Sequence, residues 1–296
     1  MATVDYPPTY TTDSVTSKDG TTIGYRQMGR GPGLILMHGG MQAAQNFMRL
    51  ATFLADDFTV YVPDRRGRGL SGSYDHHYTL QNAVDDLDAL LAKTGAHNVF
   101  ALSSGAIIAL QTALVRPASG IDKLAIFEPP LSIDGSSAME WLSRFDQEIA
   151  QGKIGAAMVT VMKGTKDTSF FGTLPRFITV PLVTMAVKAE AKEPEGGDVP
   201  IGEIVPTMHS DGQIIIDTAD TIERYQDVSA DVFLLGGSKS PAYLKLALDR
   251  LEAVLPHVRR VELKGADHVA ADDSGQPERV AQELRRFFAE VPVGVV

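Results

Sequence analysis

The segment Val99-Phe100-Ala101-Leu102-Ser103-Ser104-Gly105-Ala106-Ile107-Ile108-Ala109-Leu110 changes character halfway along its length. An apolar, strand-like run stops at two serines and a glycine, and an apolar, helix-like run begins at once. A chain that passes from strand to helix without a loop must turn sharply, so the corner residue takes a strained backbone conformation with its side chain held outward. The pattern is typical of a nucleophile elbow, G-x-S-x-G, with Ala101 in place of the first glycine.

Two serines compete for the corner of this turn. The positions two before and two after the corner crowd together, so both need small residues. Ser103 has Ala101 and Gly105 at these positions, whereas Ser104 would have the bulky Leu102 on one side. The sequence therefore predicts Ser103 as a nucleophile, and the competing interpretation is a Ser-Gly turn without chemistry.

On both sides of this turn, short apolar runs alternate with helical patterns. Continuous apolar runs are typical of strands buried on both faces, and one helix has its apolar residues on a single face from Leu80 to Ala92. This alternation with short loops predicts an α/β fold with a doubly wound, mostly parallel sheet. The expected strands are 34–37, 58–62, 99–102, 123–127, 232–235 and 259–263, after a hairpin over 14–28; the expected helices are 44–54, 80–92, 241–254 and 277–289, with one more ending near Pro117.

A long interruption separates two blocks of this alternation. Residues 131–228 are helix-leaning, rich in Met and Phe, and broken by prolines at 175, 181, 194, 200 and 206. An excursion of this length between two sheet strands is typical of a lid over an active site. The sequence predicts a core of residues 1–130 and 229–296 with an inserted helical cap over 131–228.

Composition limits the classes of function. The chain has 296 residues, 44% of them hydrophobic, and a formal net charge of −10. This acidic excess disfavours binding to nucleic acid or anionic membranes, and the lack of cysteine excludes disulfides and thiolate chemistry. Neither a signal peptide nor an apolar run of membrane-spanning length is recognisable. We expect a cytoplasmic protein whose partner is a small-molecule substrate, and the sequence predicts no oligomeric state.

Three further motifs lie at the ends of predicted strands, where parallel sheets collect their reactive residues. They are His38-Gly39-Gly40, Asp64-Arg65-Arg66-Gly67-Arg68-Gly69 and Gly265-Ala266-Asp267-His268. With the Ser103 elbow, and in this order, they resemble the α/β-hydrolase superfamily over about residues 14–130 and 229–290. The resemblance implies the α/β-hydrolase fold and a serine hydrolase of the esterase or lactonase kind, which needs no cofactor and no metal.

His268 is the candidate base for Ser103. A serine hydroxyl is a poor nucleophile near neutral pH and needs a base to take its proton. His268 follows the last predicted strand, from where it could reach Ser103. The other histidines are assigned to loops, a helix end and the cap, where His209 could touch substrate, and His38 is interpreted as structural.

The acid partner of His268 is not where the family usually supplies it. That loop, 236–241, contains no carboxylate. Some members place the acid after the preceding strand, where Glu128 stands here, and haloalkane dehalogenases and zearalenone-type lactonases resemble this placement. Glu128 is predicted to fix the tautomer of His268 and to stabilise the imidazolium. Three aspartates remain as alternatives: Asp267, Asp272 and Asp273.

The resemblance also implies the groups around the reacting carbonyl. The backbone N–H groups of Gly40 and Ser104 would form the oxyanion hole. Gly39 and Gly40 would let the backbone approach the substrate, and Met41 would line the pocket.

The resemblance also implies a structural role for the arginine-rich turn after the second buried strand. Arg65, Arg66 and Arg68 are expected to pair internally with Asp64, and not to bind phosphate or nucleic acid. The aspartates between 267 and 273 lack calcium-loop spacing, so no metal site is predicted.

The predicted reaction is cleavage of a carboxylic ester or lactone through an acyl-enzyme on Ser103, with a small to medium, mostly apolar substrate. Dehalogenation is disfavoured, because it needs a carboxylate at position 103. Carbon–carbon bond hydrolysis and acyl transfer would use the same residues. A ligand receptor with slow turnover is the alternative from another functional class.

Overall fold

A computed structural model describes residues 9–73, 78–117, 120–137, 139–165, 174–191 and 198–289. The described residues form an eight-stranded sheet in the order β1-β2-β4-β3-β5-β6-β7-β8. Only β1 with β2 and β2 with β4 are antiparallel, so the predicted, mostly parallel α/β sheet is confirmed. The strands are β1 (Thr11–Thr16), β2 (Thr22–Gly29), β3 (Gly33–Met37), β4 (Thr59–Pro63), β5 (Asn98–Leu102), β6 (Lys123–Phe127), β7 (Asp231–Gly237) and β8 (Val258–Leu263).

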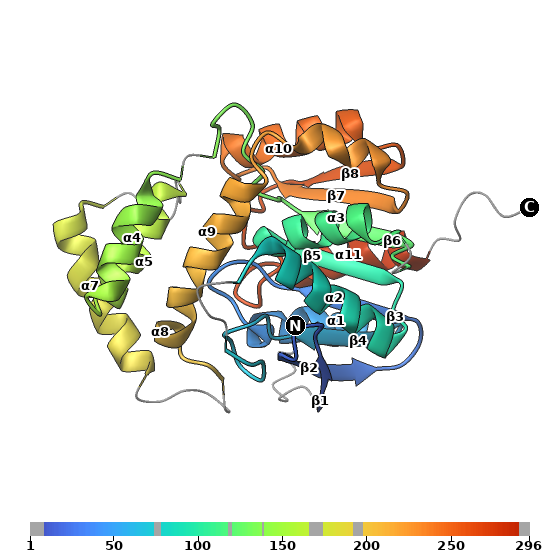
Figure 1. Ribbon diagram of the computed structural model, residues 1–296, viewed down its shortest axis with the longest axis horizontal. Helices are drawn as coiled ribbons and strands as arrows, with labels where there is room; N and C mark the ends of the chain where they lie inside the picture. Colours follow the sequence, from blue (N-terminus) through green and yellow to red (C-terminus); the bar gives the residue numbers. More distant parts are fainter. Residues whose placement is uncertain are drawn as a thin grey trace, which may run out of the picture.

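Helices cover both faces of this sheet (Figure 1). Because side chains alternate along a strand, Val99 and Ala101 of β5 join one apolar cluster, and Phe100 and Leu102 join the other. The first cluster packs against α2 (Leu80–Thr94), α3 (Ser104–Val115) and α10 (Ala242–Val254). The second packs against α1 (Met48–Leu54), which follows a 3₁₀ turn over Ala44–Phe47, and against α11 (Pro277–Ala289). Burial on both faces explains why the strand sequences are continuously apolar.

The ends of α2 show how local sequence sets an element. The Thr79 side chain accepts a hydrogen bond from the Asn82 backbone N–H and caps the first turn. Gly95 ends the helix in the left-handed conformation with φ of 64°, which glycine adopts without steric penalty. Both ends therefore follow from residues readable in the sequence.

A helical insertion joins β6 to β7, as predicted. It contains α4 (Trp141–Ala150), α5 (Ile154–Gly164), α7 (Arg176–Glu190), α8 (Ile201–Ile204), α9 (Met208–Asp217) and a 3₁₀ turn, η4 (Ile222–Asp227). Figure 1 shows α4, α5 and α7 as an outer group, with α9 standing between them and the sheet. Ile214 and Ile215 of α9 belong to the apolar cluster of the sheet, so α9 connects the outer helices to the core.

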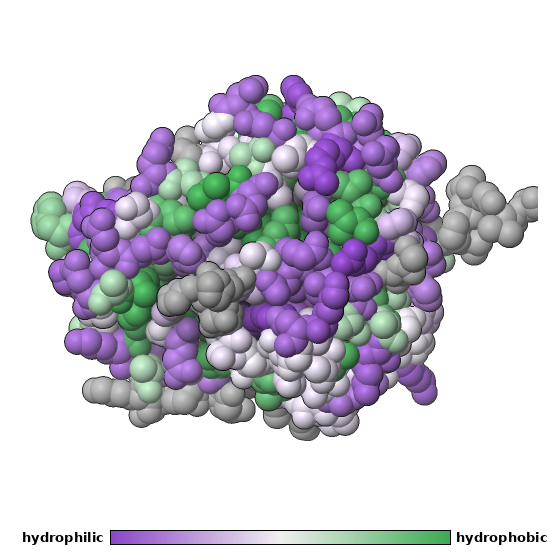
Figure 2. Space-filling model, viewed as in Figure 1, coloured by the Kyte–Doolittle hydropathy of each residue, from purple (hydrophilic) through white to green (hydrophobic). Residues whose placement is uncertain are grey.

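The outer helices have their own small core and an exposed apolar side. Leu142, Phe145, Ala157 and Val161 form that core with residues that precede and begin α9. On α7 the side chains of Phe177, Ile178, Leu182 and Met185 are exposed, and Figure 2 shows apolar residues at this end of the molecule. None of the helices in the described ranges is both long and apolar enough to cross a lipid bilayer.

Candidate active site

Ser103 stands at a strained corner between β5 and α3. Its φ is 56° and its ψ is −125°, a conformation that L-residues adopt only when the surroundings enforce it. Its backbone N–H is held by the Phe127 carbonyl of the neighbouring strand at 2.9 Å. Ser104 is already the first residue of α3 and is buried. The corner of the predicted elbow is therefore Ser103 and not Ser104.

The need for a small residue at 105 has a different origin from the one predicted. A Cβ on Gly105 would lie 2.5 Å from the His38 carbonyl oxygen and 3.1 Å from that of Met37. The loop after β3, and not Ala101, therefore sets the closest limit on position 105. Likewise, a Cβ on Gly39 would lie 2.9 Å from the Cβ of Ser103. These two glycines allow the loop after β3 and the elbow to pack in direct contact.

Glu128 and His268 form a hydrogen-bonded pair beside this corner. The Nδ1 atom of His268 lies 2.8 Å from Oε2 of Glu128, whose side chain is 0% exposed. Glu128 follows β6 directly and, like Ser103, has a positive φ, here 46°. A carboxylate facing Nδ1 favours the tautomer that carries its proton there, which leaves the Nε2 lone pair free to take a proton.

The loop after β7 holds the Glu128 carboxylate in place. The Gly237 backbone N–H donates to Oε1 of Glu128 at 2.6 Å. A Cβ on Gly236 would lie 3.1 Å from the same oxygen, so a side chain there would crowd the carboxylate. The loop where the family usually carries its acid thus supplies a hydrogen-bond donor and space for an acid from the neighbouring strand.

The three alternative acids have other partners. Asp267 is exposed and accepts from the Val269 N–H at 3.3 Å. Asp272 accepts from the Gln42 side chain at 2.9 Å. Asp273 accepts from the Arg49 N–H at 2.9 Å, and its burial raises its pKa to about 6. In the described part of the chain, none of the three hydrogen-bonds to His268.

Two backbone amides next to Ser103 remain unused by the fold. Among the described residues, neither the Gly40 N–H nor the Ser104 N–H has a hydrogen-bond acceptor. Gly40 lines the same cavity as Ser103 and His268. The Ser104 amide lies in the first turn of α3, where helix N–H groups have no intrahelical partner. Their positions fit the predicted oxyanion hole.

Gly39 does not occupy the predicted substrate-contacting position. Its N–H donates to Oε1 of Gln42 at 2.8 Å, and its carbonyl accepts from Nη1 of Arg68 at 3.2 Å. The cavity is lined by Gly40 and Met41 instead. Met41 therefore lines the cavity, whereas the backbone of Gly39 is engaged by Gln42 and Arg68.

The cavity has a volume of about 590 Å³ and lies between the core and the helical insertion. Most of its insertion side is apolar, and Ser103 and His268 lie on the core side. Lys239 and Tyr243, from the loop after β7 and from α10, also line it, and the sequence had not suggested either residue. Burial and the charge of Glu128 raise the pKa of Tyr243 to about 12, so its phenol stays protonated. The segment between β6 and β7 contributes Pro130, Ser136, Ser137, Met139, Trp141, Val161, Met162, Gly164, Thr165, Met208 and Ile215.

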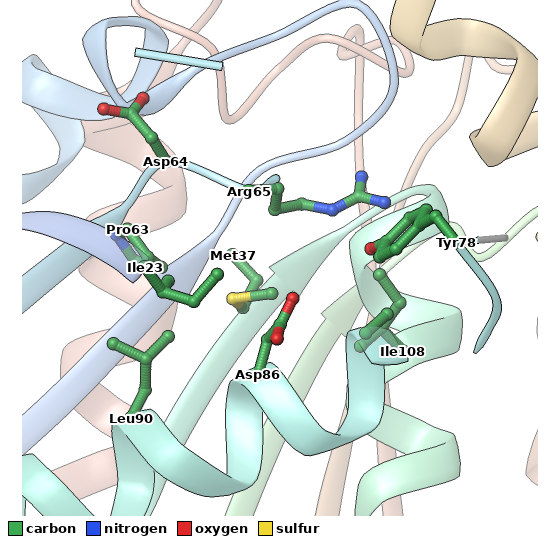
Figure 3. A pocket seen from close by; sticks show the side chains of 10 residues that line it. Ile23, Met37, Pro63, Asp64, Arg65, Tyr78, Asp86, Leu90 and Ile108 are labelled. Carbon is green, nitrogen blue, oxygen red and sulfur yellow. The ribbon is translucent and has the colours of Figure 1, made fainter. Parts of the chain in front are cut away.

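The arginines of the turn after β4 do not pair with Asp64, contrary to the prediction. Asp64 accepts from the backbone N–H groups of Ala44 at 2.7 Å and Leu70 at 3.0 Å. In Figure 3 its carboxylate points away from the guanidinium of Arg65, which extends toward Tyr78 beside a small internal void. Because the Asp64 carboxylate accepts hydrogen bonds from loop backbone N–H groups, the arginines form ion pairs with other carboxylates.

Those carboxylates come from distant elements. Arg66 pairs with Asp86 of α2 at 2.6 Å and also with Asp19. Arg65 and Arg68 pair with Asp211 of α9, at 2.7 and 2.6 Å. Both of these arginines and Asp211 are buried, so the cluster is a structural one, as expected, and it is closed to a large anionic ligand.

His38 is buried between this cluster and the loop after β3. Its Nε2 accepts from the Arg65 N–H at 3.2 Å, so Nδ1 carries the proton and faces the Gly39 carbonyl at 3.0 Å. Burial, together with the charges of Arg68 and Arg65, holds the pKa of His38 well below its usual value. It is a neutral, structural histidine, which agrees with its interpretation from the sequence.

The remaining histidines of the described ranges do not line the cavity. His209 is half-exposed and pairs with Asp146 at 2.9 Å, and it does not line the cavity. His76 and His77 lie outside the described residues.

Comparison with known proteins identifies relatives over most of the chain. Residues 34–283 match the model of the alpha/beta hydrolase family. The 2-(acetamidomethylene)succinate hydrolase of Mesorhizobium japonicum is 25% identical over 276 residues, which cover 90% of this chain and 91% of that protein. The pimeloyl-[acyl-carrier protein] methyl ester esterase of Xanthomonas axonopodis pv. citri is 24% identical over 268 residues, covering 90% and 98%. The crystal structure of an alpha/beta hydrolase from Sphaerobacter thermophilus has a TM-score of 0.75 at 29% identity, covering 93% and 100%.

Proposed function

The chain belongs to the alpha/beta hydrolase family, and we propose that it is a serine hydrolase that cleaves a carboxylic ester or lactone through an acyl-enzyme. The observation that carries the proposal is the hydrogen bond between the buried Glu128 carboxylate and His268, because this histidine lines one cavity with Ser103. A nucleophile, a base and a group that orients the base are the parts that acyl transfer requires.

In the proposed reaction, the Ser103 hydroxyl attacks the substrate carbonyl while Nε2 of His268 takes its proton. The tetrahedral intermediate carries an oxyanion, which the N–H groups of Gly40 and Ser104 would receive. His268 then gives the proton to the leaving alcohol, and the ester bond to Ser103 remains. Water, deprotonated by the same histidine, attacks this acyl-enzyme; the bond from the acyl carbon to Oγ of Ser103 breaks, His268 returns the proton to Oγ, and the acid leaves.

The cavity supports a small to medium, mostly apolar substrate. A volume of about 590 Å³ falls in the range of small-molecule sites, and methionine, tryptophan and isoleucine side chains dominate its cap side. Lys239 and Tyr243 offer hydrogen-bond donors on the opposite side, and neither side chain has a partner among the described residues. One curated relative is named as a methyl ester esterase, which favours an ester.

Labelling with a fluorophosphonate tests the proposal. The reagent should modify Ser103, and a short-chain nitrophenyl ester should give a burst of nitrophenol as the acyl-enzyme forms. Ser103→Ala should abolish both signals. Ser137→Ala is a matched control, because Ser137 lines the same cavity without belonging to the proposed catalytic set, and it should keep both. Failure of the wild-type protein to be labelled at Ser103 would refute the proposal.

The two measurements also separate the alternatives. A ligand receptor on this fold would give labelling or a burst without continued turnover. A carbon–carbon bond hydrolase or an acyltransferase would keep the burst but would turn over esters poorly compared with its own substrate. Sustained hydrolysis of simple esters or lactones, with rates that follow acyl-chain length or ring size, is the result that supports the proposed reaction.

A further inference from the structure

We propose that Asp211 of α9 is a positioning residue for the reaction, because it fixes both amides of the oxyanion hole from behind. The inference rests on the proposed function, since it concerns the orientation of the Gly40 and Ser104 N–H groups toward a reacting carbonyl. Asp211 lies in the helical insertion, 107 residues from Ser104 along the chain. It does not line the cavity and would act only through other residues.

Asp211 is a fully buried carboxylate with every oxygen engaged. Its Oδ1 accepts from the Ser104 hydroxyl at 2.8 Å and from Nη1 of Arg65 at 2.7 Å. Its Oδ2 accepts from Nη2 of Arg68 at 2.6 Å. Burial alone would raise the pKa of Asp211, but the charges of Arg65 and Arg68 lower it to about 2. The carboxylate therefore stays charged throughout the pH range in which a histidine can act as a base.

The first amide is held through the Ser104 side chain. The Ser104 hydroxyl donates to Asp211 and accepts from Nη1 of Arg65 at 3.1 Å, so two hydrogen bonds fix its position. Ser104 is the first residue of α3 and follows the strained corner directly. Fixing its side chain fixes the backbone that carries the N–H group.

The second amide is held through the peptide unit that joins Gly39 and Gly40. The carbonyl of Gly39 accepts from Nη1 of Arg68 at 3.2 Å, besides Nδ1 of His38 at 3.0 Å, and Arg68 is in turn held by Asp211. The carbonyl of Gly39 and the N–H of Gly40 belong to one planar, trans peptide, so they point in opposite directions. Anchoring the carbonyl on Arg68 therefore aims the Gly40 N–H away from the arginine cluster.

Contacts of α9 with Gly40 support the same conclusion. A Cβ on Gly40 would lie 2.9 Å from Sδ of Met208 and 3.3 Å from Oδ2 of Asp211. The backbone at Gly40 is thus packed directly against two side chains of α9. Arg68 also donates through Nε to Thr207 Oγ1 at 2.9 Å, just before this helix. One helix of the insertion therefore contacts the supports of both amides.

Two substitutions and their combination test this role. Asp211→Asn removes the charge, and Ser104→Ala removes only the hydroxyl and keeps the backbone N–H. Loss of one oxyanion-hole donor typically lowers kcat by about 10² to 10³. Because displaced donors are only weakened, we expect Asp211→Asn to lower kcat about 10- to 100-fold and Ser104→Ala several-fold. KM for a nitrophenyl ester should change little, since the oxyanion forms only after binding.

A double-mutant cycle on kcat separates positioning from a general structural role. If Ser104 transmits the effect of Asp211, the double variant should be close to Asp211→Asn alone, within about two-fold. Asp217→Asn is the matched control, because Asp217 lies on the same helix, is exposed and contacts the Gln213 side chain; its kcat should stay at the wild-type level. The rate of fluorophosphonate labelling should follow kcat in every variant.

Several outcomes would overturn the inference. An Asp211→Asn variant with the kcat and labelling rate of the wild type would overturn it. So would a double variant in which the two effects on kcat multiply, or an Asp211→Asn variant that changes only KM. If Asp211→Asn fails to fold, Ser104→Ala decides alone, because it leaves both ion pairs intact and must still slow labelling at unchanged KM. If wild-type Ser103 is not labelled at all, the proposed function fails and this inference fails with it, whereas normal labelling in all variants overturns the inference alone.

Discussion

Replacing Glu128 by glutamine changes the chemistry of the proposed site while keeping its volume. In the wild type, Oε1 accepts from the Gly237 N–H at 2.6 Å and Oε2 faces Nδ1 of His268 at 2.8 Å. Glutamine has only one oxygen for these two neighbours. If that oxygen stays on Gly237, the amide NH₂ faces Nδ1, which must then accept a hydrogen bond. The proton of the imidazole moves to Nε2, and the lone pair needed by Ser103 is lost.

The opposite orientation of the glutamine is unfavourable. Its NH₂ group would face the Gly237 N–H in a site that is 0% exposed, which leaves a buried donor unpaired at a cost of about 1–3 kcal/mol. The wrong histidine tautomer should therefore dominate. In a serine protease, the equivalent change with intact geometry lowers kcat by about 10⁴, which corresponds to about 5 kcal/mol on the activation barrier. We expect a fall of this order in kcat for Glu128→Gln.

Steady-state hydrolysis of a nitrophenyl ester measures this effect. KM should stay within a few-fold of the wild type, because Glu128 does not line the cavity. Asp267→Asn is the matched control: Asp267 lines the cavity, but its carboxylate is exposed and accepts from the Val269 N–H and not from His268, so kcat should fall less than about three-fold. More than a tenth of wild-type kcat in Glu128→Gln, or a collapse in Asp267→Asn, would refute the assignment of the acid.

Other predictions concern stability and substrate charge. Gly105→Ala should lower the free energy of unfolding by about 2 kcal/mol or more, because its Cβ would meet the His38 carbonyl at 2.5 Å, whereas Gly202→Ala, with nothing nearer than 3.5 Å, should be neutral or stabilising in urea titrations. The pKa of Asp211 is about 2 in the folded protein, compared with 3.8 for an unperturbed aspartate. The charged carboxylate therefore stabilises the fold above pH 4, and this contribution is lost as the pH falls through 2. The stability gap between the wild type and Asp211→Asn should narrow by about 2 kcal/mol between pH 5 and pH 2, and a constant gap would contradict the buried pairing. Lys239→Met should lower kcat/KM about two- to five-fold for esters that carry a carboxylate and leave neutral esters unchanged, because the exposed ammonium would lose only a screened attraction.

Most of the fold was predictable because buried strands and helices have simple patterns of apolar residues in the sequence. The run Lys123–Phe127 and the helix Pro277–Ala289 have the predicted bounds. A strand buried on both faces must be apolar throughout, and a helix on the sheet must be apolar on one side. Both requirements are local, so they can be read without knowing what packs against the element.

The candidate site was predictable where strand ends determine it. The strands β3, β5, β6, β7 and β8 are parallel, so the loops after them gather at one edge of the sheet. This places the Gly40, Ser103, Glu128 and His268 segments together without further information. Glu128 was chosen because the loop over 236–241 has no carboxylate. In the structure, that loop donates a backbone hydrogen bond to Glu128 instead.

The arginine cluster was not predictable, and the reason is physical. Asp64 is adjacent to Arg65 in the sequence, but successive side chains leave an extended chain on opposite sides, and Asp64 is taken up by two backbone N–H groups. The actual partner, Asp211, lies 143 residues beyond Arg68. On its own helix, Asp211 looks like an ordinary polar position, because neither its neighbours nor its spacing distinguish it from an exposed aspartate.

Burial of this ion cluster is an unfavourable way to stabilise a fold. Removing charges from water carries a desolvation penalty that well-packed apolar residues would avoid, so buried ion pairs are weak sources of stability. The cluster instead orients the groups it contacts. Asp211 can hold the Ser104 hydroxyl and the two guanidinium groups only when α9 lies against the elbow. Apolar side chains could keep α9 docked, but they could not orient the Gly39 carbonyl or the Ser104 side chain. Apolar packing at this position would stabilise the fold better than the buried charges do. The need to orient the Gly40 and Ser104 amides therefore accounts for the presence of these charges.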